Sequence, residues 1–505
     1  MVRRDELLLS GRDLDVADVV AVARQGRRVA IDAAARDRMR ASRAVIERLV
    51  SEGAVAYGVT TGFGDLANVR IDPDQTAELQ RNIVRSHAAG VGDPLPAEVV
   101  RAMLVLRANA LAVGLSGVRP ELVDLLCGML NAEVHPLVPS RGSVGASGDL
   151  APLAHLALVV IGEGEAWLDD AGPGPGGEAL RRAGLQPMVL EAKEGLALLN
   201  GTQLMSALAA LSLHDARRLA VAADVIGAMS LEAMLGTAAA FDEKLVGARP
   251  HPGQVAVAAH LRGLLAGSEI GASHARSQHR LQDPYSLRCM PQVHGAVRDA
   301  LDQLARVLRV EMNAATDNPL VFPSGEVVSG GNFHGEPLAL AIDYVKTAMV
   351  ELASISERRS ARLVDAHLSG LPPFLTDEPG LRSGLMIAQY TAASLVNELK
   401  VLVHPASADS IPTSANQEDH VSMGATSALH LRETIDRVEL VLAIEALCAA
   451  QGLDYRAPMR PGDGVAHAHA RLRSMVPRLA EDRPPSGDIA AVRELLRVGE
   501  LSIDG

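Results

Sequence analysis

The chain is short of the residues on which several common kinds of site depend. Its three cysteines, Cys127, Cys289 and Cys448, lie far apart and form no Cys-x-x-Cys pair. That usage is typical of a reducing cytoplasm and argues against a zinc site built from thiolates. Only four of the 48 basic residues are lysines, so a Schiff base with pyridoxal phosphate has few candidate residues. We therefore expect no metal and no pyridoxal cofactor.

Aromatic side chains and positive charge are also scarce. The 505 residues include five Tyr, five Phe and one Trp. A core this poor in rings must be filled by Ala, Leu, Val and Ile, which favours closely packed helices. The formal net charge is −13, and a chain this acidic repels a phosphate backbone. Nucleic acid is therefore excluded as an expected partner.

Secretory and membrane-spanning segments are not expected either. The N-terminus is charged and lacks the apolar centre of a secretory signal. Gly195–Leu213 is uncharged over nineteen residues, but it contains Asn200, Thr202 and Gln203 and is followed by charged residues. We interpret it as a helix buried in a bundle rather than a membrane span. The sequence thus predicts a cytoplasmic protein without a membrane partner.

Long helices are predicted in the second half of the chain. No proline occurs in Gly201–Arg249, Leu338–Gly370 or Thr413–Ala457. Apolar residues from Leu338 to Ile355 recur every three or four positions, and Val297–Met312 repeats the pattern, which indicates amphipathic helices. Some segments are apolar around most of their circumference and need neighbours on all sides. We predict a mainly α fold with a long central helical bundle, buried between the subunits of a homo-oligomer.

The first half is less regular. Glycine-rich loops at residues 58–64 and 142–148 interrupt shorter helices, and Gly162–Gly177 is expected to form a hairpin or an exposed loop. The long helices begin near Lys193. We therefore divide the chain into an N-terminal portion, residues 1–192, and a helical bundle with the C-terminal helices, residues 193–505.

The segment Arg141–His155, RGSVGASGDLAPLAH, is the most informative loop. Its three glycines could cradle a phosphate, but no Gly-Lys-Ser/Thr follows and Asp149 adds a negative charge there. A plain tight turn is a second interpretation. A third is backbone cyclisation, in which the nitrogen of Gly148 bonds the carbonyl carbon of Ala146, because neither residue is bulky. Loss of that carbonyl oxygen and of the Ser147 hydroxyl as two waters gives a methylidene-imidazolone, an electrophile made from the chain itself.

The same loop resembles the prosthetic-group loop of the aromatic amino acid ammonia-lyases. Other blocks match this family in the same order: Tyr57–Gly64, Leu79–Gly90, Glu194–Gln203, Gln282–Arg288, Gly331–Gly335 and Ser414–His420. The resemblance runs from about Gly53 to Arg456, which is most of the chain. It implies a helical fold of the fumarase/aspartase-like superfamily, a methylidene-imidazolone formed from Ala146, Ser147 and Gly148, and a homotetramer whose active sites draw residues from three subunits.

Two positions distinguish the substrate types within the family. Ser86-His87 resembles the pair of the histidine-specific members, and Glu418 stands where the phenylalanine and tyrosine enzymes carry Gln. A carboxylate can accept a hydrogen bond from an imidazole N–H, and His87 can pair with the other ring nitrogen. A phenyl ring would leave that buried charge unpaired. The resemblance therefore implies the elimination of ammonia from L-histidine to give trans-urocanate.

The resemblance also implies roles for the remaining residues. Tyr57 resembles the base that removes the β-proton, although Glu418 is an alternative base. Asn200 resembles a ligand of the substrate carboxylate or of the prosthetic carbonyl, with a structural buried amide as the alternative. The other implied roles are a carboxylate clamp at Arg288, groups that order the site and shuttle protons at Gln282 and Tyr285, and a ring against the prosthetic group at Phe333.

Alternative interpretations remain open at this point. Tyr57 could instead anchor its loop, Arg288 could form a surface ion pair, and Glu418 could cap a helix that begins after Pro412. The same prosthetic group would also serve a tyrosine or phenylalanine ammonia-lyase or a histidine 2,3-aminomutase. A non-catalytic helical relative of the fumarase and argininosuccinate-lyase superfamily is another possibility, but the intact Ala-Ser-Gly triplet argues against it.

Overall fold

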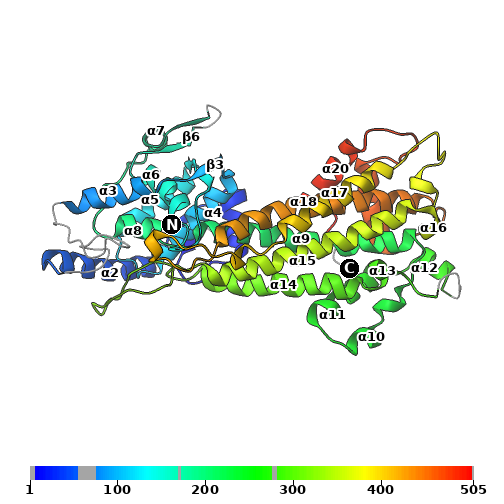
Figure 1. The fold of residues 1–505 in the computed structure, drawn as a ribbon, viewed down its shortest axis with the longest axis horizontal. Helices are drawn as coiled ribbons and strands as arrows, with labels where there is room; N and C mark the ends of the chain where they lie inside the picture. Colours follow the sequence, from blue (N-terminus) through cyan, green and yellow to red (C-terminus); the bar gives the residue numbers. More distant parts are fainter. Residues whose placement is uncertain (1–5, 55–74, 169–171, 276–280, 503–505) are drawn as a thin grey trace. The chain divides into compact units, whose positions relative to one another are not determined.

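The computed structural model describes residues 6–54, 75–168, 172–275 and 281–502 (Figure 1). The chain divides into two compact units. The first comprises Met1–His214, Leu304–Asp343 and Pro405–Leu429, and the second comprises Asp215–Gln303, Tyr344–His404 and His430–Gly505. All boundaries except the one between His404 and Pro405 fall inside long helices, and both units are discontinuous in sequence. The predicted division at residues 192/193 stays a prediction.

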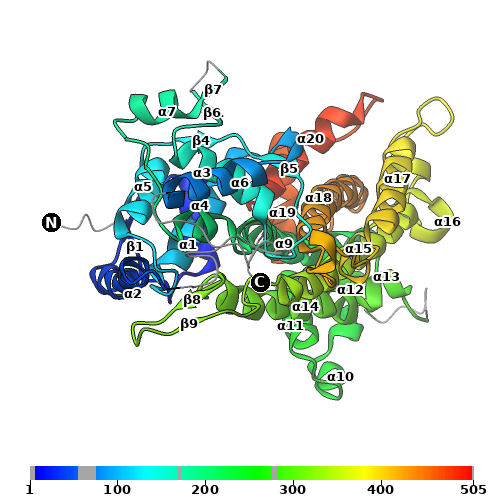
Figure 2. The same cartoon turned by 60° about the vertical axis from the view of Figure 1, so that its left-hand side comes forward.

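Short helices and strands build the start of the first unit. The helices are α1 (Val16–Gln25), α2 (Ala33–Ser51), α3 (Thr76–His87), α4 (Ala97–Ala112), α5 (Pro120–Asn131), α6 (Leu150–Val160), α7 (Gly176–Arg182) and α8 (Glu194–Leu199). Helix α4 packs against both α1 and α5 (Figure 2). It is buried at every position from Val99 to Ala112, as a helix with neighbours on all sides must be.

Small sheets join these helices. Strands β1 (Leu7–Leu9) and β2 (Val29–Ile31) pair in parallel, and β3 (Val91–Pro94) pairs antiparallel with β5 (Pro139–Arg141). A three-stranded antiparallel sheet has the order β4 (His135–Pro136), β6 (Glu165–Trp167), β7 (Pro173–Pro175). Strands β6 and β7 form the hairpin predicted within Gly162–Gly177. Later in the chain, β8 (Leu320–Val321) and β9 (Val327–Val328) form another antiparallel pair.

Long helices follow, and the predicted apolar stripes lie inside them. These helices are α9 (Gln203–Ala233), α14 (Met290–Glu311), α15 (Glu336–Val364) and α18 (Gly424–Asp454). On α15 the stripe residues Leu338, Ile342, Val345, Met349 and Leu352 are all fully buried. Each such side chain contributes roughly 1.5–3 kcal/mol through removal from water. No described helix has both the length and the apolar character needed to cross a lipid bilayer.

Buried ion pairs connect the four long helices within the second unit. Arg359 on α15 makes a two-point ion pair with Glu445 on α18, and both side chains are inaccessible to solvent. Ser230 on α9 donates to the same carboxylate at 2.6 Å. His294 on α14 lies 2.7 Å from Asp224 on α9. Because breaking a buried pair leaves a charge unpaired, these contacts fix which helix faces lie together.

Shorter helices complete the second unit. They are α10 (Glu243–Gly247), α11 (Pro252–Leu264), α12 (Glu269–Ser273), α13 (Tyr285–Arg288), α16 (Ala366–Ser369), α17 (Met386–Leu402), α19 (Asp463–Met475) and α20 (Pro485–Arg497). Within the described residues, 3₁₀ turns occur at Ala238–Phe241, Pro373–Leu375, Ala406–Ala408 and Ser414–Asn416, of which the last two lie in the first unit.

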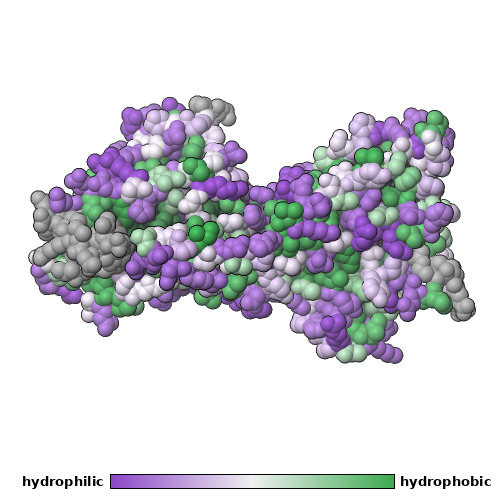
Figure 3. Space-filling model, viewed as in Figure 1, coloured by the Kyte–Doolittle hydropathy of each residue, from purple (hydrophilic) through white to green (hydrophobic). Residues whose placement is uncertain are grey.

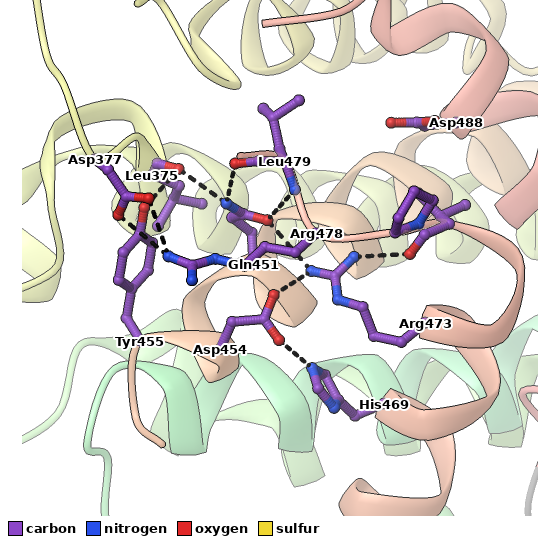
Figure 4. A network of polar contacts seen from close by, with 12 residues as sticks. Leu375, Asp377, Gln451, Asp454, Tyr455, His469, Arg473, Arg478, Leu479 and Asp488 are labelled. Carbon is purple, nitrogen blue, oxygen red and sulfur yellow. Dashed lines mark hydrogen bonds and ion pairs between the residues drawn. The ribbon is translucent and has the colours of Figure 1, made fainter. Parts of the chain in front are cut away.

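A polar network fastens the C-terminal segment to α18 (Figure 4). The side-chain amide of Gln451 donates to the carbonyl of Leu479 at 3.0 Å and accepts from its N–H at 3.0 Å. Asp454 lies 2.8 Å from both His469 and Arg473. Burial favours the neutral acid, but these two partners outweigh it and hold the pKa of Asp454 below its usual value. His469 is thus engaged in a structural ion pair.

Glu232 gives the second unit a measurable dependence on pH. Its carboxylate lies near the end of α9, is 2% exposed, and accepts the backbone N–H of Gly462 at 3.0 Å. Burial raises its pKa from 4.5 to about 7. Between these values the folded chain holds a proton that the unfolded chain has lost, so rising pH removes stability. From pH 4.5 to 7 we expect the parent to lose up to about 3 kcal/mol relative to Glu232→Gln, which stays neutral.

Denaturant unfolding at a series of pH values measures this difference. Glu494→Gln, at an exposed position on α20, is the matched control and should follow the parent at every pH. If the free energies of unfolding of the parent and of Glu232→Gln differ by the same amount at every pH in this range, the pKa of Glu232 is not raised in the folded protein.

Candidate active site

The Ala-Ser-Gly loop connects β5 to α6 and is held by one buried carboxylate. Ala146 and Gly148 are buried and Ser147 is half-buried. Asp149 directly follows and is inaccessible to solvent. Its side chain accepts the hydroxyl of Ser143 at 2.8 Å, and Ser143 in turn accepts the N–H of Gly145 at 3.2 Å. The carboxylate therefore braces the loop from within.

Asp149 also binds the beginning of α9. Its second oxygen accepts the N–H groups of Leu204 at 2.9 Å and Met205 at 3.0 Å, two donors that have no partner inside the helix. It makes no capping bond to α6, the helix that it immediately precedes. Burial raises its pKa to about 6, while the three donors oppose that shift. Residues 200–202 connect α8 to α9 and are called the Asn200 turn below. The contact of Asp149 thus fixes the loop to the helix that follows this turn.

The loop passes so close to this turn that only glycine fits. Gly148 has a φ of +79°, and a Cβ there would lie 2.2 Å from the carbonyl oxygen of Gly201. On the other side, Ser422 donates to the carbonyl of Gly145 at 3.0 Å, and the N–H of Met423 donates to that of Val144 at 2.8 Å. Backbone contacts on both sides hold the loop in one conformation.

Asn200 reaches the central residue of the loop. Its side-chain N–H donates to the carbonyl of Ser147 at 3.3 Å. Its side-chain oxygen is buried and accepts no hydrogen bond from any described residue. Of the alternatives predicted for this amide, the contact favours a ligand of the carbonyl that would belong to the prosthetic ring. The orphaned oxygen marks a place where a donor from a bound molecule would fit.

Glu418 contacts the side chain of the same serine. One carboxylate oxygen accepts the Ser147 hydroxyl at 2.8 Å, and the other accepts the hydroxyl of Thr413 at 2.8 Å. The alternative that Glu418 caps a helix beginning after Pro412 is wrong. Residues 414–416 have positive φ values, which no α-helix of L-residues sustains, and α18 begins only at Gly424.

His87 lies at the end of α3, within electrostatic reach of Glu418. Its Nδ1 is 2.8 Å from the carbonyl of Ile83, so this nitrogen carries the proton and Nε2 is an acceptor. Burial lowers the pKa of His87, while the Ile83 carbonyl and Glu418 oppose the shift. The neutral ring and the carboxylate together present two acceptors.

The turn that carries Phe333 lies beside the segment of Glu418. His334 contacts the carbonyl of His420 at 3.1 Å, and the two imidazole rings are parallel with centroids 5.9 Å apart. Gly335 packs against Met205, where a Cβ would lie 2.6 Å from the sulfur. Phe333 itself is half-buried. The first unit thus brings together the loop, Asn200, Glu418 and His87, with the Phe333 turn adjacent to Glu418.

The other predicted substrate ligands belong to the second unit. Arg288 lies over the ring of Tyr285, with its guanidinium carbon 4.7 Å from the ring centroid. Its Nε is buried without a hydrogen-bond partner among the described residues, and no ion pair of the described part includes Arg288. Tyr285 is 70% exposed and Gln282 is also exposed. Arg359 supports this turn by donating to the carbonyl of Ser286 at 3.2 Å.

Tyr57 lies outside the described residues, so its role stays a prediction. Sequence reasoning missed Ser422 and the capping role of Asp149, because each acts on a partner far away in the chain. It also missed Thr413, although its partner Glu418 is only five residues away. The only available signal was the position of Asp149 directly after the triplet. Among the residues that the structure describes, no group of three His, Cys, Asp or Glu side chains is placed to hold a metal ion.

The residues around the triplet fit a methylidene-imidazolone. The glycine that must supply the ring nitrogen has no room for a side chain, and the carbonyl that would enter the ring accepts an amide donor. The Ser147 hydroxyl, which must leave as water, donates a hydrogen bond to the carboxylate of Glu418. These contacts define the class: a mainly helical protein with an Ala-Ser-Gly loop braced against an amide and an acid.

The chain belongs to the aromatic amino acid lyase family, which matches residues 14–474. A histidine ammonia-lyase from Anaeromyxobacter sp. (strain K) is 58% identical over 507 residues, covering 99% of this chain and 100% of the relative. The crystal structure of histidine ammonia-lyase from Trypanosoma cruzi has a TM-score of 0.92 at 45% identity, covering 98% of this chain and 94% of that one. Tyrosine aminomutase from Streptomyces globisporus has a TM-score of 0.94 at 38% identity, covering 98% and 97%. The predicted family and helical fold class are confirmed.

Proposed function

We propose that this protein is a histidine ammonia-lyase, a carbon–nitrogen lyase that eliminates ammonia from L-histidine to give trans-urocanate. The relatives support this activity, since sequences bearing that name are 52–58% identical over nearly the full chain. The single observation that carries the proposal is the contact of Glu418 with Ser147 at 2.8 Å, with His87 in reach of the same carboxylate. It supports a role for both side chains as ligands of the substrate ring, beside the serine that would become the electrophile.

This pair of acceptors favours a protonated imidazole, whose two nitrogens both carry an N–H, over a phenyl or phenol ring. The His87 ring offers an unprotonated Nε2, and Glu418 offers a carboxylate oxygen. In the chain with an intact serine, one oxygen of Glu418 is occupied by the Ser147 hydroxyl. Loss of that hydroxyl as water would free the oxygen for an N–H of the substrate. A phenyl ring has no donor to offer, and leaving buried acceptors unpaired disfavours its binding.

The proposed prosthetic group, a methylidene-imidazolone formed from Ala146, Ser147 and Gly148, would supply an electrophilic carbon for this reaction. The residues of the chain would do the rest. Asn200 holds the carbonyl of Ser147, where negative charge is stabilised by an N–H donor. Glu418 and His87 orient the imidazole ring, and Arg288 binds the substrate carboxylate. Tyr57 is the proposed base for the β-proton, and Tyr285 and Gln282 order the site.

A product assay tests the proposed function. Purified protein is incubated separately with L-histidine, L-tyrosine and L-phenylalanine and followed in the ultraviolet, with chromatography for β-amino acids. Urocanate from histidine alone is the expected result. Cinnamate or coumarate would mean that Glu418 and His87 do not select the ring, and β-histidine would identify an aminomutase.

We further propose that the protein is a homotetramer whose active sites combine residues from different subunits. Large apolar side chains are exposed on α15 and α17, among them Tyr344 on α15 at 53% and Ile387 and Tyr390 on α17 at 55% and 59%. Figure 3 shows apolar surface interspersed among polar residues on the face drawn. Such side chains are typical of faces that a second copy covers. The exposed Tyr285 beside Arg288 would likewise be completed by another subunit. All three cysteines are free thiols, which agrees with the proposed cytoplasmic location.

Mixed tetramers test the shared sites. Ser147→Ala removes the electrophile and Arg288→Met removes the carboxylate clamp, so each variant alone should be nearly inactive. If one site takes these residues from different subunits, random co-assembly should restore about one quarter of the parent activity. Ser147→Ala mixed with Asn200→Ala is the matched control, because these residues bond within one chain, and it should restore none. Mixed tetramers that stay inactive with Arg288→Met would contradict sharing between subunits.

A further inference from the structure

A buried arginine lies directly behind the Asn200 turn. Arg107 comes from the middle of α4 and is completely inaccessible to solvent. One of its terminal nitrogens donates to the backbone carbonyl of Asn200 at 2.8 Å and to the side-chain oxygen of Gln203 at 2.8 Å. Gln203 is held in place by donating to the hydroxyl of Thr316 at 2.9 Å. The guanidinium thus spans the turn from Asn200 to the first residue of α9.

Contacts around this arginine leave no freedom in the turn. A Cβ on Gly201 would lie 2.4 Å from the same terminal nitrogen, so the guanidinium packs closely against the backbone. The side chain of Asn200 points the other way and donates to the carbonyl of Ser147. Two hydrogen bonds in series therefore connect Arg107 to the loop, one through the backbone of Asn200 and one through its amide.

The charge of Arg107 is only partly compensated. The carboxylate that acts on it electrostatically, Asp317, is already in a buried ion pair with Lys193 at 2.8 Å. Two cations share that acid, so Arg107 has no carboxylate of its own. The other carboxylates at the turn bind elsewhere, Glu311 to the hydroxyl of Thr202 and Asp149 to the N–H of Leu204. In addition, the Nε of Arg107 and its second terminal nitrogen make no hydrogen bond to any described residue. A buried cation with unmet donors is a poor way to stabilise a fold, so its presence here points to a different use.

We propose that Arg107 is a positioning residue for the reaction: it holds Asn200 against the carbonyl of Ser147 and sets positive charge behind that carbonyl, so that negative charge developing on its oxygen is stabilised. This inference rests on the proposed function, because it concerns the carbonyl that would enter the prosthetic ring. The effect follows the logic of an oxyanion hole, in which donors fixed before the reaction act on developing charge. Arg107 acts through Asn200 and need not touch the substrate.

The test compares Arg107→Met, Arg107→Lys and a matched control. Arg101→Met removes another buried arginine of α4, whose partners are the backbone carbonyls of Val22 and Leu130. Each full-length protein is assayed for intact mass, near-ultraviolet absorption, kcat and KM with L-histidine. For Arg107→Met we expect the prosthetic group still to form, so the protein stays lighter than its sequence by two waters. The near-ultraviolet absorption band of that group should shift, and kcat should fall about tenfold to 100-fold with KM nearly unchanged. Arg107→Lys should recover most of kcat, and Arg101→Met should keep kcat and the band.

Each other outcome decides against the inference or against its premise. An unchanged kcat and band in Arg107→Met would overturn it. Loss of the mass deficit in Arg107→Met would make Arg107 a maturation or folding residue instead. An equal fall of kcat in Arg101→Met would mean that any buried arginine of α4 matters only for packing. A parent protein that carries the mass deficit but converts no histidine would sink the proposed function, while the band shift would still test the role of Arg107.

Discussion

Ser147→Ala is expected to abolish activity, with a loss of about 10⁴-fold or more in kcat. The variant lacks the hydroxyl that must leave as water, so no methylidene carbon can form from this loop. The fold should survive, because the loop is held by other contacts: Asp149 binds Ser143 and α9, and Ser422 binds the carbonyl of Gly145. Urocanate release and intact mass are the measurements. The parent should be lighter than its sequence by two waters, and the variant should have its full sequence mass.

Ser140→Ala is the matched control for this experiment. Ser140 lies on β5, seven residues before Ser147, and its substitution should change neither the mass deficit nor kcat. Activity that persists in Ser147→Ala would show that the chemistry does not depend on this serine. A parent of full sequence mass that is nevertheless active would lead to the same conclusion by an independent route.

Glu418→Gln is expected to lower kcat/KM for L-histidine by about 100-fold. The amide has nearly the same size and can still accept the hydroxyl of Thr413, so the 413–423 segment should keep its conformation. What is lost is a charge-assisted hydrogen bond to the imidazole N–H in a partly buried site. Because phenylalanine makes no such bond, its inhibition constant as a competitor of L-histidine should change much less. The two changes together therefore isolate recognition of the ring.

Asp419→Asn, an exposed neighbour, is the control and should leave both values unchanged. A fall of kcat for histidine in Glu418→Gln with KM unchanged would show that the carboxylate acts on the reacting atoms. That result would revive the alternative in which Glu418, rather than Tyr57, removes the β-proton.

Much of the scaffold follows from local sequence. The spacing of Leu338, Ile342, Val345 and Met349 predicts a helix with one buried face, and those side chains are fully buried. The glycine- and proline-rich stretch after Gly162 predicts a hairpin, and β6 pairs with β7 there. These predictions succeed because helical periodicity and turn chemistry act between residues close in the chain.

The site depended on contacts that no local pattern specifies. An aspartate directly before a helix is expected to cap that helix, yet Asp149 caps α9, more than fifty residues later. Glu418 lies 271 positions from Ser147 and contacts it only because α18 starts later than expected. Arg107 gave no signal in the sequence, since a lone arginine in an apolar helix has no readable partner.

The sequence by itself determined the family, the helical scaffold and the residue types of the Ala-Ser-Gly loop. Each of these depends on short motifs or on periodicity, whose physical basis is local. Only the tertiary structure decided which groups surround Ser147: an amide on its carbonyl, a carboxylate on its hydroxyl, and a buried cation behind the amide. Hydrogen bonds and charge interactions act over a few ångströms in space, and packing alone brings residues that are far apart in the chain to that distance.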